Sequence, residues 1–164
     1  MDHVILNKHQ LDQKIQRLAY QILEEHQDEK YLIIAGVKGN GYIFAGEINE
    51  FFKTISDIKT VLLEIEVDKS MPFTNSVICK DEGIEHHPLV LVDDVLNSGG
   101  TLIAAVNYFI NKPMKTIRTV ALIDRNHRKF PIAADFVGMS LATTLEEHVE
   151  VISENGVLKE VILK

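Results

Sequence analysis

The chain has 164 residues, with 24 acidic and 17 basic side chains, a formal charge of -7 and 46% hydrophobic residues. This length suits one domain with its own core, so residues 1–164 are expected to form a single domain. The excess of acid argues against general affinity for nucleic acids. Cys79 is the only cysteine, which excludes an internal disulfide and favours a reduced, cytoplasmic setting. The sequence shows neither a signal segment nor an apolar run of membrane-spanning length.

The first elements are a short strand and an amphipathic helix. Residues 4–6 are apolar, and Asn7 can cap the helix that follows. One face of this helix is expected to be apolar, through Leu11, Ile15, Leu18, Ala19 and Ile22. Residues 31–35 then form a continuous apolar run that ends at glycine, and apolar residues recur at helical spacing over 44–55. The pattern predicts a buried strand, a turn and a second helix.

Strands and helices continue to alternate along the chain. Further strands are expected at 58–65, 89–92 and 117–123, with a helix from Thr101 to about Asn111. This alternation predicts an α/β fold whose mostly parallel sheet carries helices on both faces and binds ligands at the carboxyl ends of its strands. The tail differs, because the apolar segments 149–153 and 157–163 flank Asn155-Gly156, which is typical of a hairpin turn.

Two adjacent carboxylates, Asp93 and Asp94, follow the strand at 89–92, and a hydroxyl-bearing loop at 97–101 comes next. The loop opens into a helix N-terminus, where unpaired backbone N–H groups attract anions. Turn chemistry alone explains the loop, but not two carboxylates at the end of a buried strand. In an extended strand the pair points to opposite faces, so the two share a role only if the backbone turns. The pattern indicates a phosphate site beside carboxylates that suit sugar hydroxyls or the waters of Mg²⁺.

A glycine-rich turn at 36–41 follows the strand at 31–35 and lets the backbone approach an anion closely. It fails the dinucleotide fingerprint, because Phe44 stands where the last glycine is required. It fails the Walker pattern as well, because no Lys-Ser/Thr pair follows Gly41. A plain strand-to-helix turn remains an alternative. Residues 68–87 are the least patterned stretch, and we interpret them as a lid.

Residues 89–101 resemble the phosphoribosyl-diphosphate motif of the type I phosphoribosyltransferases, although Ser98 stands where that family usually has threonine. Residues 4–6, 36–39 and 122–138 agree with the same resemblance. Together they look most like the family of bifunctional pyrimidine-operon attenuators and uracil phosphoribosyltransferases, with hypoxanthine-guanine enzymes as cousins. The resemblance implies the type I phosphoribosyltransferase fold, with a small hood segment and the C-terminal strands of the hairpin at 129–164. It also implies a homodimer or homotetramer, by analogy only.

The resemblance assigns roles to particular residues. It implies that Asp93 and Asp94 serve the ribose hydroxyls and Mg²⁺ in catalysis. The residues that would hold the 5-phosphate are Asn97, Ser98, Gly99, Gly100 and Thr101. The residues that would face pyrophosphate are Val37, Lys38, Gly39, Asn40 and Arg125, although many attenuator relatives carry arginine where this chain has Asn40. Arg125 has the simpler alternative of a solvated loop charge.

Base binding is expected at Phe136, which could stack on a nucleobase, and at the Val137 backbone, although a plain core strand fits both residues equally well. Purine-using relatives carry an aspartate where this chain has Asn97, and an amide cannot accept a proton as that carboxylate can. The expected activity is therefore transfer of ribose 5-phosphate from phosphoribosyl diphosphate to uracil, with hypoxanthine or guanine as other acceptors. One alternative is an RNA-binding attenuation regulator, against which the acidic charge and the absence of arginine from residues 68–87 argue. The other is a non-catalytic sensor of phosphoribosyl diphosphate or nucleotide.

Overall fold

The computed structural model describes residues 1–68, 77–80 and 82–164, so residues 69–76 and 81 of the expected lid lie outside it. The elements in the described residues are β1 (His3–Leu6), α1 (Lys8–Glu25), β2 (Tyr31–Val37), α2 (Asn40–Ile55), β3 (Lys59–Val67), β4 (Val77–Cys79), β5 (Pro88–Leu96), α3 (Gly100–Ile110), β6 (Thr116–Asp124), β7 (Phe136–Ser140), β8 (Val149–Glu154) and β9 (Val157–Leu163). Among the described residues, no helix is both long and apolar enough to cross a membrane.

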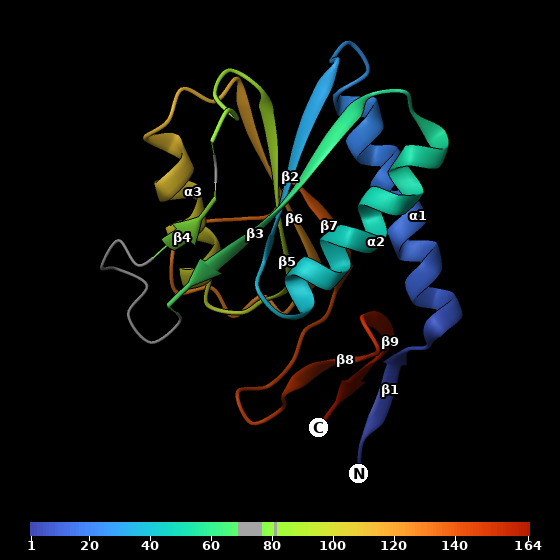
Figure 1. Ribbon diagram of the computed structural model, residues 1–164. Coiled ribbons are helices and arrows are strands. Elements are labelled where there is room, and N and C mark those ends of the chain that lie inside the picture. The colour runs from blue at the N-terminus through green and yellow to red at the C-terminus, as the bar shows by residue number, and fades with distance from the viewer. Residues whose placement is uncertain (69–76, 81) are drawn as a thin grey trace.

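A central sheet has the strand order β4-β3-β2-β5-β6-β7. The pairs β3–β2, β2–β5, β5–β6 and β6–β7 are parallel, and β4 is antiparallel to β3. Helices α1 and α2 cover one face and α3 covers the other (Figure 1). Each face buries its own apolar cluster, one with α1 and α2 and the other with α3. The prediction of an α/β fold with a mostly parallel sheet and helices on both faces is confirmed.

The first helix forms as its sequence predicts. Asn7 accepts a hydrogen bond from the Gln10 backbone, and the Gln10 side chain accepts one from the Asn7 backbone, each at 2.9 Å. This capping box supplies partners for two N–H groups at the N-terminus of α1. The buried residues of α1 are Leu11, Ile15, Leu18, Ala19 and Ile22, as predicted.

A second, smaller sheet has the order β1-β9-β8 and is antiparallel. Asn155 and Gly156 join β8 to β9 with φ values of 53° and 74°, the conformation of a type I′ hairpin turn, so the predicted hairpin is confirmed. The expected hood at 129–164 differs in its membership. Strand β7 pairs with β6 in the central sheet, while β1, from the opposite end of the chain, completes the small sheet.

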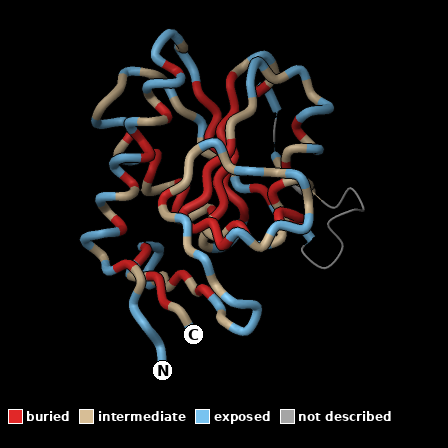
Figure 2. Tube along the Cα trace, turned by 180° about the vertical axis from the view of Figure 1, so that it is seen from behind, coloured by how far each residue is buried: buried red, intermediate tan, exposed pale blue. Residues whose placement is uncertain are grey.

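The parallel strands of the central sheet end at the edge that faces the small sheet, at the lower end of the sheet in Figure 1. Most of β2, β5 and β6 is buried (Figure 2). Gly36 allows α2 to lie directly on β2, since a Cβ atom there would come within 2.6 Å of the Tyr42 Cα atom. Strand β5 extends beyond the predicted end at Val92, because β6 continues to pair with it as far as Leu96. The acidic pair therefore lies within the strand rather than after it.

Candidate functional site

The residues at the end of β5 and the start of α3 line a cavity of about 160 Å³, and they are Asp93, Val95, Leu96, Asn97, Ser98, Gly99, Gly100, Thr101 and Leu102. Two larger surface hollows, of about 540 and 590 Å³, lie elsewhere: at the opposite end of the central sheet and beside α1 and α2. Neither larger hollow is lined by the first residue of a helix or by the residue before it, although the second reaches Tyr42 and Ile43 of α2. We therefore take the smaller cavity as the candidate site, because it combines a carboxylate with a helix N-terminus.

The acidic pair, Asp93 and Asp94, interrupts the regular alternation of β5. Before the pair, Leu91 packs with α3 and Val92 packs with α1 and α2. Beyond it the order is reversed, since Val95 packs in the α1–α2 cluster and Leu96 in the α3 cluster. The register of β5 against β6 nevertheless runs without a shift from Pro88 to Leu96, so the pair lies in a continuous strand. Val95 belongs to a cluster that also contains residues of the small sheet. A shared role for the two carboxylates therefore stays a prediction.

Asp93 is only 5% exposed and lies between two helix starts. Its Oδ1 atom accepts a hydrogen bond from the Asp94 backbone N–H at 2.8 Å. On one side Asp93 shares the cavity with the first residues of α3. On the other side it lies against α2, because a Cβ atom built on Gly41 would be 3.0 Å from Asp93 Oδ1. Asp94 is half-buried and is not among the residues that line the described cavity.

The loop before α3 leaves that helix start open. Gly99 precedes the helix with φ of +89° and, within the described residues, no side chain caps the helix. The Ser98 Oγ atom accepts a hydrogen bond from the Gly100 N–H at 3.2 Å, so the Ser98 hydroxyl proton remains available to a ligand. The Ser98 carbonyl accepts from the Lys129 and Phe130 N–H groups at 2.8 and 3.3 Å, which fixes the loop against the chain after β6.

The turn between β2 and α2 resembles the loop before α3, because it also ends in a glycine with positive φ. Gly39 precedes α2 with φ of +96°, again with no side-chain cap from the described part of the chain. The Lys38 N–H donates to the Ile65 carbonyl at 2.7 Å, which ties the turn to β3. The Lys38 Nζ atom is 3.6 Å from Glu66 Oε1, and both side chains are more than half exposed. Residues 37–40 do not line the cavity, but the Gly41 contact with Asp93 brings the start of α2 beside it.

Helices α2 and α3 therefore differ from α1 at their N-termini. Helix α1 has both halves of a capping box, whereas α2 and α3 each begin after a glycine with positive φ and have no side-chain cap among the described residues. Uncapped N–H groups with the positive end of the helix dipole form an anion site. Two such sites flank Asp93, which is what a ligand with two separate phosphate groups requires.

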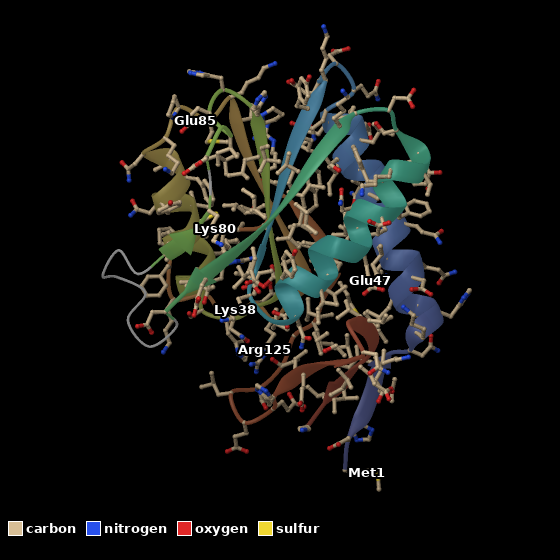
Figure 3. The ribbon with its side chains drawn as sticks, viewed as in Figure 1. Met1, Lys38, Glu47, Lys80, Glu85 and Arg125 are labelled. Atoms are coloured by element: carbon tan, nitrogen blue, oxygen red, sulfur yellow. The ribbon has the colours of Figure 1, made fainter. Side chains whose placement is uncertain are left out.

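Arg125, at the end of β6, is 8% exposed and lies between the central sheet and the small sheet (Figure 3). Its Nη1 atom donates to Asn97 Oδ1 at 3.0 Å and its Nε atom donates to Thr143 Oγ1 at 3.0 Å. Its Nη2 atom donates to the Thr144 and Glu147 carbonyls at 3.3 and 2.6 Å. The guanidinium is thus committed to other parts of the chain, and a direct pyrophosphate contact by Arg125 finds no support in this arrangement.

Residues 143–147, which connect β7 to β8, were missed from the sequence. Thr144 and Glu147 bind each other reciprocally: the Thr144 N–H donates to Glu147 Oε2 at 2.6 Å, and the Glu147 N–H donates to Thr144 Oγ1 at 3.3 Å. The hydrogen bonds from the Thr144 backbone and hydroxyl lower the pKa of Glu147 from its ordinary value. The spacing Thr-x-x-Glu is a capping-box pattern and was a readable signal.

Phe136 and Val137 do not lie at the carboxyl ends of the strands, where ligand binding is expected. They begin β7 and pair with Val120 and Ala121, within β6 rather than at its end. Phe136 packs against the α1–α2 core cluster, and the Val137 carbonyl accepts a hydrogen bond from Arg17 at 3.1 Å. The edge of the sheet is reached only after Ser140, and a base-binding role for Phe136 and Val137 has no support in this placement.

The donor set suits one kind of metal. Within residues 1–68, 77–80 and 82–164, no group of three or more His, Cys, Asp or Glu could enclose an ion. A dedicated protein cage is thus absent from this part of the chain. Mg²⁺ commonly needs only one or two carboxylates, with substrate phosphates and waters completing its shell. The acidic pair fits such a shared site.

The phosphoribosyl transferase domain family matches residues 4–157 of the chain. The chain is 31% identical over 165 residues to a bifunctional protein PyrR of Haemophilus ducreyi, with 94% of this chain and 92% of the relative covered. It is 32% identical over 156 residues to a protein of the same name from Clostridium kluyveri, with coverage of 90% and 88%.

Solved structures of related enzymes share the fold. A hypoxanthine-guanine phosphoribosyltransferase of Bacillus anthracis matches with a TM-score of 0.73 and 23% identity, over 85% of this chain and 84% of that one. A hypoxanthine phosphoribosyl transferase of Trypanosoma cruzi matches with a TM-score of 0.75 and 16% identity, over 86% and 78%.

Proposed function

The chain belongs to the phosphoribosyl transferase domain family and is a phosphoribosyltransferase, and from this premise we propose that it transfers ribose 5-phosphate from phosphoribosyl diphosphate to uracil. The bond between C1′ and the pyrophosphate oxygen breaks, a bond from C1′ to a ring nitrogen forms, the proton of that nitrogen passes to solvent, and pyrophosphate leaves. The observation that carries the proposal is the placement of Asp93 between two uncapped helix starts beside the cavity.

The starts of α3 and α2 bind different phosphate groups of the substrate. The backbone N–H groups of Gly99 and Thr101, with the Ser98 hydroxyl, bind the 5-phosphate at the start of α3. The N–H groups of the turn at 37–40 bind pyrophosphate at the start of α2, and Lys38 adds positive charge. Asp93 and Asp94 accept hydrogen bonds from the ribose hydroxyls. No protein nucleophile is required, because the reaction is accelerated by positioning the two reactants and by neutralising the leaving group.

Mg²⁺ is the proposed cofactor, held by Asp93 and Asp94 together with oxygens of the substrate. When bound, it would neutralise negative charge on the pyrophosphate. The protein itself also neutralises negative charge on the substrate, through the N-termini of α2 and α3. Their N–H groups are already in place before the substrate binds, so they need not move during the reaction.

The decisive experiment combines calorimetry with a pyrophosphate assay. Phosphoribosyl diphosphate is titrated into the protein with Mg²⁺, and pyrophosphate release is then measured with uracil, hypoxanthine and guanine. Binding followed by release with uracil is the expected result. Binding without release for any base would instead favour the non-catalytic sensor, and absence of binding would refute the proposal.

A second candidate function is RNA-dependent regulation, favoured by the likeness to proteins named bifunctional protein PyrR over most of the chain. The sequence expectation against RNA rested on the net charge and on the arginine-free segment at 68–87, and this likeness leaves that expectation without support. Filter binding of a pyrimidine-operon leader RNA at two salt concentrations tests this candidate. Specific binding near physiological salt, with a salt-dependent affinity, would establish it. A homo-oligomer is proposed by analogy with the same family.

A further inference from the structure

The chain contains two Asn-Gly pairs, Asn40-Gly41 and Asn155-Gly156. In such a pair the glycine nitrogen can attack the side-chain carbonyl of the asparagine, because glycine has no Cβ atom to hinder the approach. The attack also requires that the asparagine side chain and the backbone between the two residues are free to move. The two pairs are alike in sequence, but the fold places them in different surroundings.

The first pair is held by the fold. Asn40 is the first residue of α2, and its side-chain nitrogen donates a hydrogen bond to the Val151 carbonyl. Gly41 is buried, and a Cβ atom built on it would lie 3.0 Å from Asp93 Oδ1. Ring closure at Asn40 would break the side-chain hydrogen bond and turn the backbone out of the helix. The fold therefore protects Asn40.

The second pair is free by comparison. Asn155 and Gly156 are both exposed in the turn between β8 and β9. Neither the Asn155 side chain nor the Gly156 N–H group makes a hydrogen bond to any residue that the structure describes. A Cβ atom built on Gly156 would have no atom within 4 Å, so the space around the attacking nitrogen is open.

The turn can open without unfolding the rest of the protein. Its last pair of strand residues is Glu154 with Val157, and both are exposed. The register of the hairpin also shifts between Ile152 and Ser153, just below the turn. A hairpin tip with so few buried contacts opens at a low cost in free energy. Asn155 can then leave its φ of 53° and bring its side-chain carbonyl to the next backbone nitrogen.

We infer that Asn155 is a site of spontaneous deamidation in the folded protein, whereas Asn40 is protected. The Gly156 nitrogen forms a bond to Asn155 Cγ, the bond from Cγ to the amide nitrogen breaks, and ammonia leaves with the proton of the Gly156 nitrogen. Water then opens the resulting cyclic imide. Cleavage at Cγ gives aspartate, and cleavage at the main-chain carbonyl carbon gives isoaspartate. The reaction needs no enzyme, oxidant or cofactor, and it is independent of phosphoribosyl transfer.

The products are expected to weaken the hairpin. Isoaspartate lengthens the main chain of the turn by one atom, which the two-residue type I′ turn does not accommodate. Both products also add a carboxylate next to Gly156, which lines the hollow beside α1 and α2 together with Glu47 and Glu50. Like charges repel there. Because Glu47 accepts a hydrogen bond from the Leu158 N–H close to the turn, the contact between α2 and the small sheet is weakened as well.

The test compares the two pairs in folded and unfolded protein. The folded protein and a sample in guanidinium chloride are incubated at mildly alkaline pH, digested with trypsin and compared with unincubated protein by mass spectrometry. Peptide 39–53 carries the first pair and peptide 130–159 carries the second. In the folded protein, conversion of Asn40 is expected to be roughly tenfold slower than that of Asn155, or slower still, because its hydrogen bond must break first. In guanidinium chloride the two rates are expected to converge.

Two variants separate the effects of the charge and of the longer main chain. Asn155→Asp adds the carboxylate but keeps a normal main chain, and Asp-Gly also forms type I′ turns. The midpoint of urea unfolding is therefore expected to be lower for the incubated wild-type protein than for Asn155→Asp. Asn155→Gln closes its larger ring far more slowly, so incubation is expected to leave its midpoint unchanged.

Each outcome bears on the inference. Equal rates at Asn40 and Asn155 in the folded protein would overturn it, and so would conversion of Asn155 only after unfolding. Selective conversion of Asn155 with an unchanged midpoint would confirm the site and refute the loss of stability. None of these measurements uses enzymatic activity, so failure of the proposed phosphoribosyl transfer would leave the result intact.

Discussion

The Asn40 side chain donates a hydrogen bond to the Val151 carbonyl at 2.8 Å, which joins the first residue of α2 to strand β8 of the small sheet. A second contact follows one side of the same helix, where Glu47 Oε2 accepts from the Leu158 N–H at 3.1 Å. Figure 3 shows Glu47 on α2 above the small sheet. Two hydrogen bonds therefore join α2 to the small sheet, and the first of them lies beside the turn proposed to bind pyrophosphate.

Replacing Asn40 by alanine leaves the Val151 carbonyl without its donor. Because an unsatisfied and partly buried carbonyl costs about 1–3 kcal/mol, the free energy of unfolding is expected to fall by that amount. Urea unfolding monitored by circular dichroism measures the change. Asn111→Ala is the matched control, since Asn111 also donates to a backbone carbonyl, at 2.7 Å, but on an exposed helix end. Equal losses of unfolding free energy in the two variants would show that the Asn40 contact stabilises the protein no more than an exposed contact does.

Replacing Asp93 or Asp94 by asparagine tests the acidic pair. Asparagine keeps an oxygen that can accept the Asp94 N–H hydrogen bond but loses the charge that binds hydroxyl groups strongly. Loss of one hydrogen bond to a charged group predicts a decrease in kcat/KM of roughly 10- to 100-fold, with little change in the melting temperature. Asp28→Asn, in the exposed turn after α1, serves as the control. Wild-type rates in both Asp93→Asn and Asp94→Asn would remove the pair from the mechanism.

Replacing Gly99 by alanine tests the backbone of the loop before α3. The φ value of +89° costs an L-residue about 1–2 kcal/mol, and the new Cβ atom would also lie 2.5 Å from Ile132 Cγ2. Gly156→Ala isolates the first effect, because its φ is +74° and no atom lies within 4 Å of its added Cβ. Urea unfolding is expected to show the larger loss for Gly99→Ala, accompanied by weaker binding of phosphoribosyl diphosphate in calorimetry. A loss no larger than that of Gly156→Ala would contradict the close contact.

The Thr144–Glu147 turn is expected to respond to acid. Its hydrogen bonds lower the pKa of Glu147 below the ordinary value of 4.5, so the turn is stabilised above that pH. This stabilisation is lost as the pH falls through the lowered pKa, because the protonated carboxyl accepts hydrogen bonds less well. Exchange of the Thr144 amide hydrogen, corrected for its intrinsic pH dependence, is expected to accelerate there. Glu147→Gln keeps an acceptor without a titrating charge and is expected to abolish the acceleration; its persistence in that variant would disprove the assignment.

Local sequence determined most of the elements and the position of the two loops that are proposed to bind phosphate groups. Asn7 and Gln10 cap the first helix, and the spacing of the apolar residues along it predicts its buried face. Asn155-Gly156 predicts the last turn. These features need only neighbouring residues. The prediction that both glycine-containing loops end parallel strands placed them at one edge of the sheet, because parallel strands share a direction.

Tertiary structure decided the features that depend on which distant residues meet. The register of β7 against β6 moved Phe136 away from the edge of the sheet, and pairing with β9 brought β1 into the small sheet. The sequence predicted Arg125 as a pyrophosphate contact, with a solvated loop charge as the alternative, but the fold surrounds it with acceptors from Asn97 and from residues 143–147. Neighbouring residues determine helix and strand propensity and the type of each turn. The register of paired strands and the burial of a side chain depend on contacts between residues that are distant in the chain. For that reason the sequence located the site, and only the folded chain showed how its side chains are oriented.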